Sequence, residues 1–217
     1  CINYQYVKES RHNRNFGNDA LLNRNEFVHI IGYNIDLATQ FKKNRFILGF
    51  DGQYSTVRSI ADKTNINTGI QQPLDTRYPD GKNFMSLTSV YASHIGKYGK
   101  HITINDGIRI GISSLHSSFN DTVFFKFPFH SVTQTNFTIS GNVGLLYTPA
   151  PKWKIALLFN TGFRVPNTDD LSKVFESVPG ILLHPNNSLK PEKTINSEIN
   201  ISKQFGSSIK WENIFWV

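Results

Sequence analysis

The sequence has one cysteine, one methionine and no apolar run of about 18 residues, the length that a transmembrane helix needs. The single cysteine, Cys1, excludes a disulfide framework and a cysteine-based zinc site. The first residues form neither an initiator methionine nor a basic and apolar signal segment, so we expect the chain to begin within a longer protein. A membrane-spanning β-strand needs only about 10 residues of alternating character, so the lack of an apolar helix does not indicate a soluble protein.

The charge is basic, with a net value of +7, but the basic residues are scattered along the sequence and no predicted helix or stripe collects them. This distribution does not favour nucleic-acid binding and fits a solvated surface, with anionic lipid headgroups as a second possible partner. Aromatic residues make up 13% of a chain whose mean hydropathy is negative. That combination is typical of strands with one apolar face.

Apolar and polar residues alternate with a period of two, which predicts β-strands. Between His101 and Ser113, isoleucines occupy one face and polar residues or glycine the other, and only Asp106 breaks the pattern. The same alternation predicts about nine strands, many longer than the average strand of globular proteins. The predicted strands are 2–7, 27–40, 46–56, 85–97, 101–113, 137–148, 153–163, 194–205 and 209–217.

Short and long connections alternate strictly along the chain. The short links are 41–45, 96–100, 149–152 and 206–208, and the long ones are 8–26, 57–84, 114–134 and 164–193. Up-and-down membrane barrels have short periplasmic turns and long extracellular loops. The pattern therefore places the long segments outside the cell, and the last three of them are the candidate ligand-binding loops.

The predicted fold class is all-β, an antiparallel up-and-down transmembrane β-barrel of which this chain forms part. A soluble sandwich would also alternate, but its solvent face would carry more Lys and Glu than these Asn-, Thr-, Ser-, Gly- and Gln-rich faces. Because an odd strand count does not close a typical bacterial barrel, we expect residues 1–217 to be a fragment of a larger barrel domain. Candidate aromatic-girdle residues near strand ends are Tyr98, Tyr147, Trp153, Phe163, Trp211 and Trp216.

Two boxes late in the chain carry a family resemblance. The first runs Phe163-Arg164-Val165-Pro166-Asn167, and the second runs Pro185-Asn186-Asn187-Ser188-Leu189-Lys190-Pro191-Glu192. They resemble, in order, the Phe-Arg-Ala-Pro and Asn-Pro-x-Leu-Lys-Pro-Glu boxes of the late barrel of TonB-dependent outer-membrane receptors, with departures at Val165 and at Asn187-Ser188. Residues 9–16 and the stretch Thr76-Arg77-Tyr78-Pro79-Asp80-Gly81 look like the same family.

The resemblance implies a receptor in the outer membrane of a Gram-negative bacterium, in contact with lipid and lipopolysaccharide. It would take up a scarce nutrient, most commonly an iron complex such as a ferric siderophore or haem, and would work with the TonB-ExbB-ExbD complex through a plug domain that these residues do not include. Haem or a ferric complex would be cargo, not a cofactor, and the resemblance implies no enzyme and no nucleic-acid partner. The alternatives are an adhesin or structural β-protein without transport and, disfavoured because no Ser/His or Asp/His constellation stands out, an outer-membrane enzyme.

The candidate site residues fall into two groups. Those that match the family boxes are expected to shape the barrel, and they are Phe163, Arg164, Pro166, Leu171, Pro185, Asn186, Leu189, Pro191 and Glu192. Among them, Arg164 and Glu192 are candidates to pair near the barrel rim or the plug. Candidate ligand-binding residues are Arg77, Tyr78 and His184. His184 lies between the two boxes, where haem receptors of the family carry a histidine ligand, although a lone imidazole without a positioned partner does not define a site. No metal site is predicted.

Overall fold

A computed structural model describes residues 1–217 except 121–129, 172–174, 179–180, 184–185 and 187. The described residues form one large antiparallel sheet in which consecutive long strands are neighbours, in the order β1-β2-β3-β5-β6-β7-β8-β11-β12. These strands are β1 (Ile2–Asn13), β2 (Ala20–Phe41), β3 (Asn44–Asn65), β5 (Asn83–Tyr98), β6 (Ile102–Ser118), β7 (Ser131–Tyr147), β8 (Trp153–Arg164), β11 (Glu192–Phe205) and β12 (Ile209–Trp216). The predicted all-β, antiparallel up-and-down architecture is confirmed.

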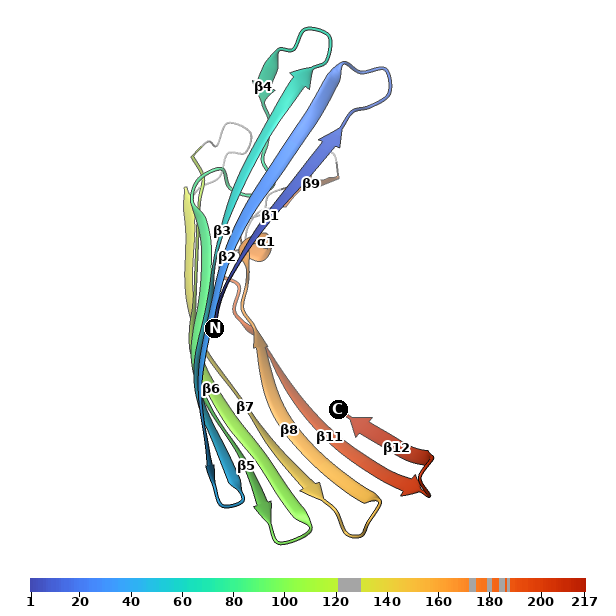
Figure 1. The fold of residues 1–217 in the computed structure, drawn as a ribbon. Coiled ribbons are helices and arrows are strands. Elements are labelled where there is room, and N and C mark those ends of the chain that lie inside the picture. Colours follow the sequence, from blue (N-terminus) through green and yellow to red (C-terminus); the bar gives the residue numbers. More distant parts are fainter. Residues whose placement is uncertain (121–129, 172–174, 179–180, 184–185, 187) are drawn as a thin grey trace.

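Smaller elements lie in two of the long connections. The short strand β4 (Gln71–Pro73) pairs with the far end of β3, and the connection between β8 and β11 holds one helical turn, α1 (Thr168–Leu171), and a hairpin of β9 (Phe175–Val178) and β10 (Ile181–Leu183). Figure 1 shows the sheet as a curved wall, with α1 and β9 on the side toward which it curves. Among the described residues, no helix has the length and apolar character needed to cross a membrane.

The connections at one end of the sheet are tight turns of two to five residues, which join β2 to β3, β5 to β6, β7 to β8 and β11 to β12. Each holds one residue with a positive φ: Lys42, Gly99, Lys152 and Gly206. Left-handed backbone of this kind is typical of tight hairpin connections. The long connections lie at the opposite end (Figure 1), so the predicted alternation of short and long links is confirmed.

One face of the sheet is apolar and exposed. In register across three strands, Ile110 lies beside Val90 of β5 and Ile139 of β7, and all three side chains are exposed. On the same face of β7, Phe137 and Tyr147 are ten residues apart, which corresponds to about 25 Å along the barrel axis at the usual strand rise and tilt. That height matches the apolar band of an outer-membrane barrel.

The opposite, concave face is polar. Buried side chains of the described residues are mainly hydroxyls, amides and one carboxylate, and the buried hydrophobic side chains are Leu115, Val132 and Val165. Such a distribution is the reverse of a soluble β-sandwich, in which apolar faces pack together and polar faces meet solvent. It fits a wall with lipid on its convex side and a wet lumen on its concave side.

Several boundaries predicted from sequence were wrong. Residues 8–26, expected to be a loop, mostly continue β1 and β2, and only residues 14–19 connect them. β3, β6 and β7 also extend well past their predicted ends. Above an apolar band both faces of a strand can be polar, so the alternation that marks a strand disappears while the backbone pairing continues.

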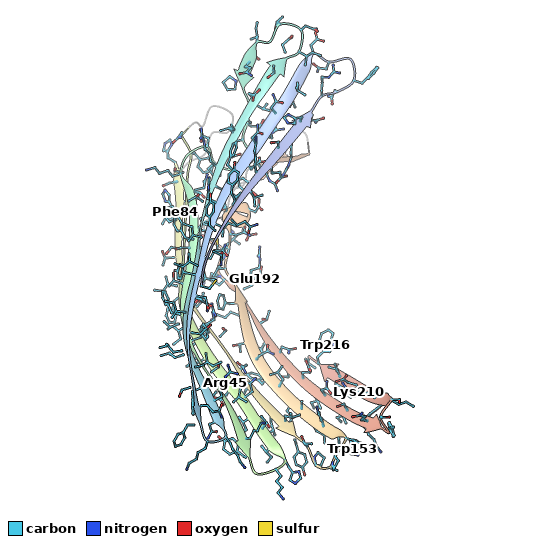
Figure 2. The ribbon with its side chains drawn as sticks, in the orientation of Figure 1. Arg45, Phe84, Trp153, Glu192, Lys210 and Trp216 are labelled. Carbon is cyan, nitrogen blue, oxygen red and sulfur yellow. The ribbon has the colours of Figure 1, made fainter. Side chains whose placement is uncertain are left out.

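One candidate girdle residue also differs from expectation. Trp216 does not lie in an aromatic girdle: it pairs with Glu198 of β11 and lies on the concave side of the sheet (Figure 2). Asp106, which interrupts the isoleucine pattern, lies on the convex face, where its Oδ1 is 2.9 Å from Nδ1 of His94. Asp106, the acidic residue in the isoleucine row of β6, therefore has His94 of β5 as its partner.

Candidate functional site

The concave face at the long-loop end is covered by two chain segments, and we treat this region as the candidate ligand-binding mouth. The first segment, residues 74–82, follows β4 and is held by Arg24, which donates to both carboxylate oxygens of Asp75 at 3.0 and 3.1 Å. Pro79 is fully buried, and its carbonyl accepts a 2.6 Å hydrogen bond from the Asn83 side chain. These contacts fix the segment against the wall.

Arg77 and Tyr78, predicted as ligand-binding residues, lie in this segment. Arg77 Nη1 is 3.8 Å from the Glu9 carboxylate, its guanidinium stacks 5.4 Å from the ring of Tyr78, and its Nε is buried without a hydrogen-bond partner among the described residues. The backbone N–H of Tyr78 donates to Ser59 Oγ at 3.5 Å. The structure therefore brings both residues to the mouth, and no contact in it tests their role in ligand binding.

The second covering segment is α1, and it meets the first through Tyr78. Burial raises the pKa of Tyr78 to about 12, assisted by the charge of Asp169 and by the hydrogen bond between the two side chains. Two connections far apart in the sequence, β3 to β5 and β8 to β11, are thus joined across the mouth. Sequence reasoning gave no sign of this contact.

The first family box builds α1. Asn167 is its N-cap: Asn167 Oδ1 accepts from the Asp170 N–H at 3.1 Å, and Asp170 Oδ2 accepts from the Asn167 N–H at 3.0 Å. This is the reciprocal geometry of a capping box. Val165 and Pro166 are buried just before it, and Leu171 ends the helical turn.

Arg164 links this turn to the wall, as expected for a rim residue. Its guanidinium donates to both Asp170 oxygens at 2.9 and 2.7 Å and to Glu192 Oε1 at 3.2 Å. Glu192 lies directly opposite Arg164 in the β8–β11 ladder and, like it, on the concave side (Figure 2). Although partial burial disfavours its charged form, the Asn167 backbone and Arg164 hold the pKa of Asp170 below its ordinary value.

The second box anchors the return to the sheet. Asn186 Oδ1 accepts from the Ser188 N–H at 2.9 Å, and Leu189 packs against the buried pair Leu115 and Val132 of β6 and β7. Pro191 stands immediately before β11, and Phe163 pairs with Lys193 in the ladder beside it. Pro185 and His184 lie outside the described residues.

Below the mouth, the concave face carries a polar network that the sequence analysis missed. The Tyr91 hydroxyl donates to Asp36 and accepts from the Asn34 amide at 3.2 Å, while Arg109 donates to Asp51 and stacks 5.5 Å from the Tyr91 ring. These residues come from β2, β3, β5 and β6, and only the sheet register brings them together.

A buried carboxylate lies beneath residues 74–82. Glu26 is 2% exposed, and neither of its oxygens has a hydrogen-bond partner among the described residues. Burial raises its pKa, and the nearby carboxylate of Glu9 adds to the shift, against the opposing charges of Arg11 and Arg24. Within the described part of the chain, no group of three or more His, Cys, Asp or Glu side chains is arranged to hold a metal ion.

Comparison with known proteins gives one family match. Residues 2–214 match the family model described as TonB dependent receptor-like, β-barrel. No curated protein sequence matches the chain significantly.

Solved structures share the fold at low sequence identity. The copper transporter OprC aligns with a TM-score of 0.80 and 14% identity over 99% of this chain and 34% of its own. The ferric yersiniabactin uptake receptor FyuA from Yersinia pestis aligns with a TM-score of 0.67 and 14% identity, over 99% of this chain and 32% of its own. The Serratia marcescens hemophore receptor HasR, solved with its hemophore HasA and heme, aligns with a TM-score of 0.62 and 9% identity, over 99% of this chain and 39% of its own. The chain spans about a third of the length of these structures.

Proposed function

Because the chain belongs to the TonB-dependent receptor-like β-barrel family, we propose that it forms wall, lumen surface and outer loops of an outer-membrane receptor for TonB-energised nutrient uptake. Residues 1–217 are, in this proposal, one part of the barrel domain of a larger receptor. The plug domain and the TonB-ExbB-ExbD contact belong to other parts of that receptor.

The observation that carries this proposal is the opposite character of the two faces of one sheet. An exposed apolar band about 25 Å high faces outward, and a polar lumen with charged networks faces inward. Long connections fold over the mouth of that lumen, where the Tyr78–Asp169 contact joins two of them. An adhesin needs outer loops, but it has no need for loops that close over a polar lumen.

We propose an iron complex, either a ferric siderophore or haem, as the cargo. Support comes from solved relatives whose names specify ferric yersiniabactin and heme, although another relative is a copper transporter. We assign Arg77 and Tyr78 to ligand contact, because both lie in the segment that covers the mouth.

The test is made on the full-length parent protein in its native cells. Membranes are fractionated, and the abundance of the receptor is compared in iron-replete, iron-starved and haem-supplemented cultures. Outer-membrane location with strong induction under iron starvation is expected. Recovery in the soluble fraction would contradict the barrel proposal, whereas outer-membrane location without induction would retain the receptor and contradict iron as its cargo.

A further inference from the structure

The net positive charge of this chain is concentrated at the short-turn end of the sheet. Residues 39–46, 96–103, 148–155 and 203–210 contain nine of the 23 Lys and Arg residues and none of the 16 Asp and Glu residues. The rest of the chain therefore has 14 basic and 16 acidic residues, so these four turns account for the whole net charge of +7. The basic residues that read as scattered along the sequence meet in space because every short turn lies at the same end (Figure 1).

We call these nine residues the basic rim: Lys42, Lys43, Arg45, Lys97, Lys100, Lys152, Lys154, Lys203 and Lys210. All are exposed except Lys203, which is half-buried. Lys210 is paired with Glu212 at 2.6 Å, and within the described part of the chain no ion pair engages the other eight. The rim is therefore a positive surface that the described side chains leave largely uncompensated.

Aromatic side chains fix the height of this rim relative to the apolar band. Trp153, Lys203 and Trp211 lie side by side in one row across β8, β11 and β12, on the convex face. The Lys203 amine is 4.6 Å from the centroid of the Trp153 ring and 4.7 Å from that of Phe205. Tryptophan and tyrosine concentrate where hydrocarbon gives way to lipid headgroups, so the amine lies at the headgroup level.

A second turn repeats the arrangement. The Lys42 amine is 5.4 Å from the centroid of the Phe41 ring, at the end of β2, and Phe41 is exposed. The turn between β7 and β8 also contacts the neighbouring strand, because the Lys152 carbonyl accepts a 2.8 Å hydrogen bond from the Gln204 N–H. The backbone of Lys152 therefore lies next to that of residues 203–204.

We propose that the basic rim binds the phosphate groups of anionic phospholipids in the periplasmic leaflet, with the Trp153–Lys203–Trp211 row and Lys152 as its principal site. Lysine amines supply the charge and donors for a phosphate, and the flanking indoles supply an amphipathic surface for the glycerol region. Short turns place this end of the barrel at the periplasmic side. The inference rests on the bilayer placement in the proposed function and adds a lipid-binding site to it.

The test uses the full-length parent receptor purified in detergent, with phosphatidylglycerol and phosphatidylcholine as probes and native mass spectrometry as the readout. The variant Lys152→Gln/Lys203→Gln is compared with Lys63→Gln/Lys82→Gln, which removes the same charge at the extracellular end. We expect the wild type to prefer phosphatidylglycerol and the rim variant to lose about five-fold in affinity per lysine, the factor that corresponds to about 1 kcal/mol per charge. The control variant and Lys203→Arg should bind like the wild type.

Equal binding of both lipids by the wild type, or an unchanged preference in the rim variant, would overturn the proposal. A rim variant that keeps its lipid preference but loses an acidic periplasmic protein from the purified receptor would also overturn it, in favour of protein docking. If the rim variant does not fold, the wild-type receptor still provides a test. Its binding of phosphatidylglycerol must weaken as salt is added, because a contact between lysine and phosphate is electrostatic. A receptor that transports its cargo and shows no lipid preference refutes this inference alone.

Discussion

The hydroxyl of Tyr78 donates a hydrogen bond to the carboxylate of Asp169 and so joins two long connections from distant parts of the sequence. Tyr78 follows β4, and Asp169 lies in the single turn of α1. Each side of the contact has further hydrogen bonds. The Tyr78 N–H donates to Ser59 Oγ, and the Asn167 N–H donates to Asp170 Oδ2 within α1 and its cap. In the proposed function, this contact lies at the mouth through which a ligand would enter.

Replacing Tyr78 with Phe should loosen the mouth without unfolding the barrel. The change removes one hydrogen bond to a carboxylate, worth about 1–3 kcal/mol, and keeps the ring. Hydrogen exchange in residues 74–82 of the full-length receptor should accelerate, while exchange in β5 and β6 stays unchanged. Tyr98→Phe, at the short-turn end of β5, serves as the control; equal acceleration in both variants would contradict the contact.

The same contact predicts a pH dependence. The pKa of Tyr78 rises from 10.0 to about 12 in the folded protein, so its stabilising contribution is complete below pH 10 and is lost as the pH rises toward 12. Difference absorbance of the wild type against Tyr78→Phe should show one tyrosine that ionises near pH 12. Ionisation of that tyrosine near pH 10 would show that the hydroxyl is exposed.

Glu26→Gln should stabilise the receptor at neutral pH. Burial raises the pKa of Glu26 above its ordinary value of 4.5. The stability that the protonated carboxyl contributes to the folded protein is therefore present below pH 4.5 and is lost as the pH rises. We expect the substitution to gain about 1–3 kcal/mol at pH 7 and nothing near pH 4, because it removes a buried charge. Thermal unfolding of the full-length receptor at both pH values checks this.

Glu9→Gln is the matched control for Glu26→Gln, since the Glu9 carboxylate is exposed and pairs with Arg11 at 2.6 Å. Neutralising Glu9 removes a charge that disfavours the ionised form of Glu26 but also breaks the exposed pair with Arg11, so it should stabilise the receptor less than Glu26→Gln does at pH 7. If both substitutions stabilise the receptor equally, the effect comes from the general charge of the mouth and not from burial of Glu26.

Arg164→Ala should release α1 from the wall, because Arg164 contacts both Asp170 and Glu192. Proteolysis within residues 165–171 is expected to increase. Arg164→Lys should restore only part of the protection, since Arg164 uses two separate nitrogens, Nη2 for Asp170 and Nη1 for Glu192, and a lysine has only one. Glu192→Gln removes a single partner and should have the smaller effect. Identical proteolysis in all four proteins would contradict a bridging role.

The role of His184 in haem uptake stays a prediction, because His184 lies outside the described residues. If haem is the cargo and His184 its ligand, His184→Ala should lower haem binding at least about ten-fold, while His12→Ala, in the upper part of β1, should not. The Soret absorbance of haem titrated into the purified receptor measures both. An unchanged affinity in His184→Ala would remove this residue from the haem site.

Sequence patterning predicted the wall well and the mouth poorly, for a physical reason. In the apolar band, lipid on one side and lumen on the other enforce a period of two, so all nine strands were identified. Above the band neither face must be apolar, and the long polar ends of β1, β2 and β3 therefore read as loops. The family boxes succeeded where composition failed, since they located the Arg164–Glu192 pair.

The burial of Glu26 and the network of Tyr91 and Arg109 were not predictable from one sequence. Their members are separated by tens of residues, and only the register of the strands brings Asp51 to Arg109 and Asp36 to Tyr91. The basic rim was missed in the same way. A charge distribution that looks uniform along a meander becomes polarised once every second connection lies at the same end.

The most direct test of the central claim is uptake by the native cells. Cells with and without the full-length receptor are given iron-labelled siderophore or haem, before and after collapse of the proton gradient. The account predicts saturable uptake that requires both the receptor and the gradient. Uptake that persists without the receptor, or that continues unchanged after the gradient is collapsed, would contradict it.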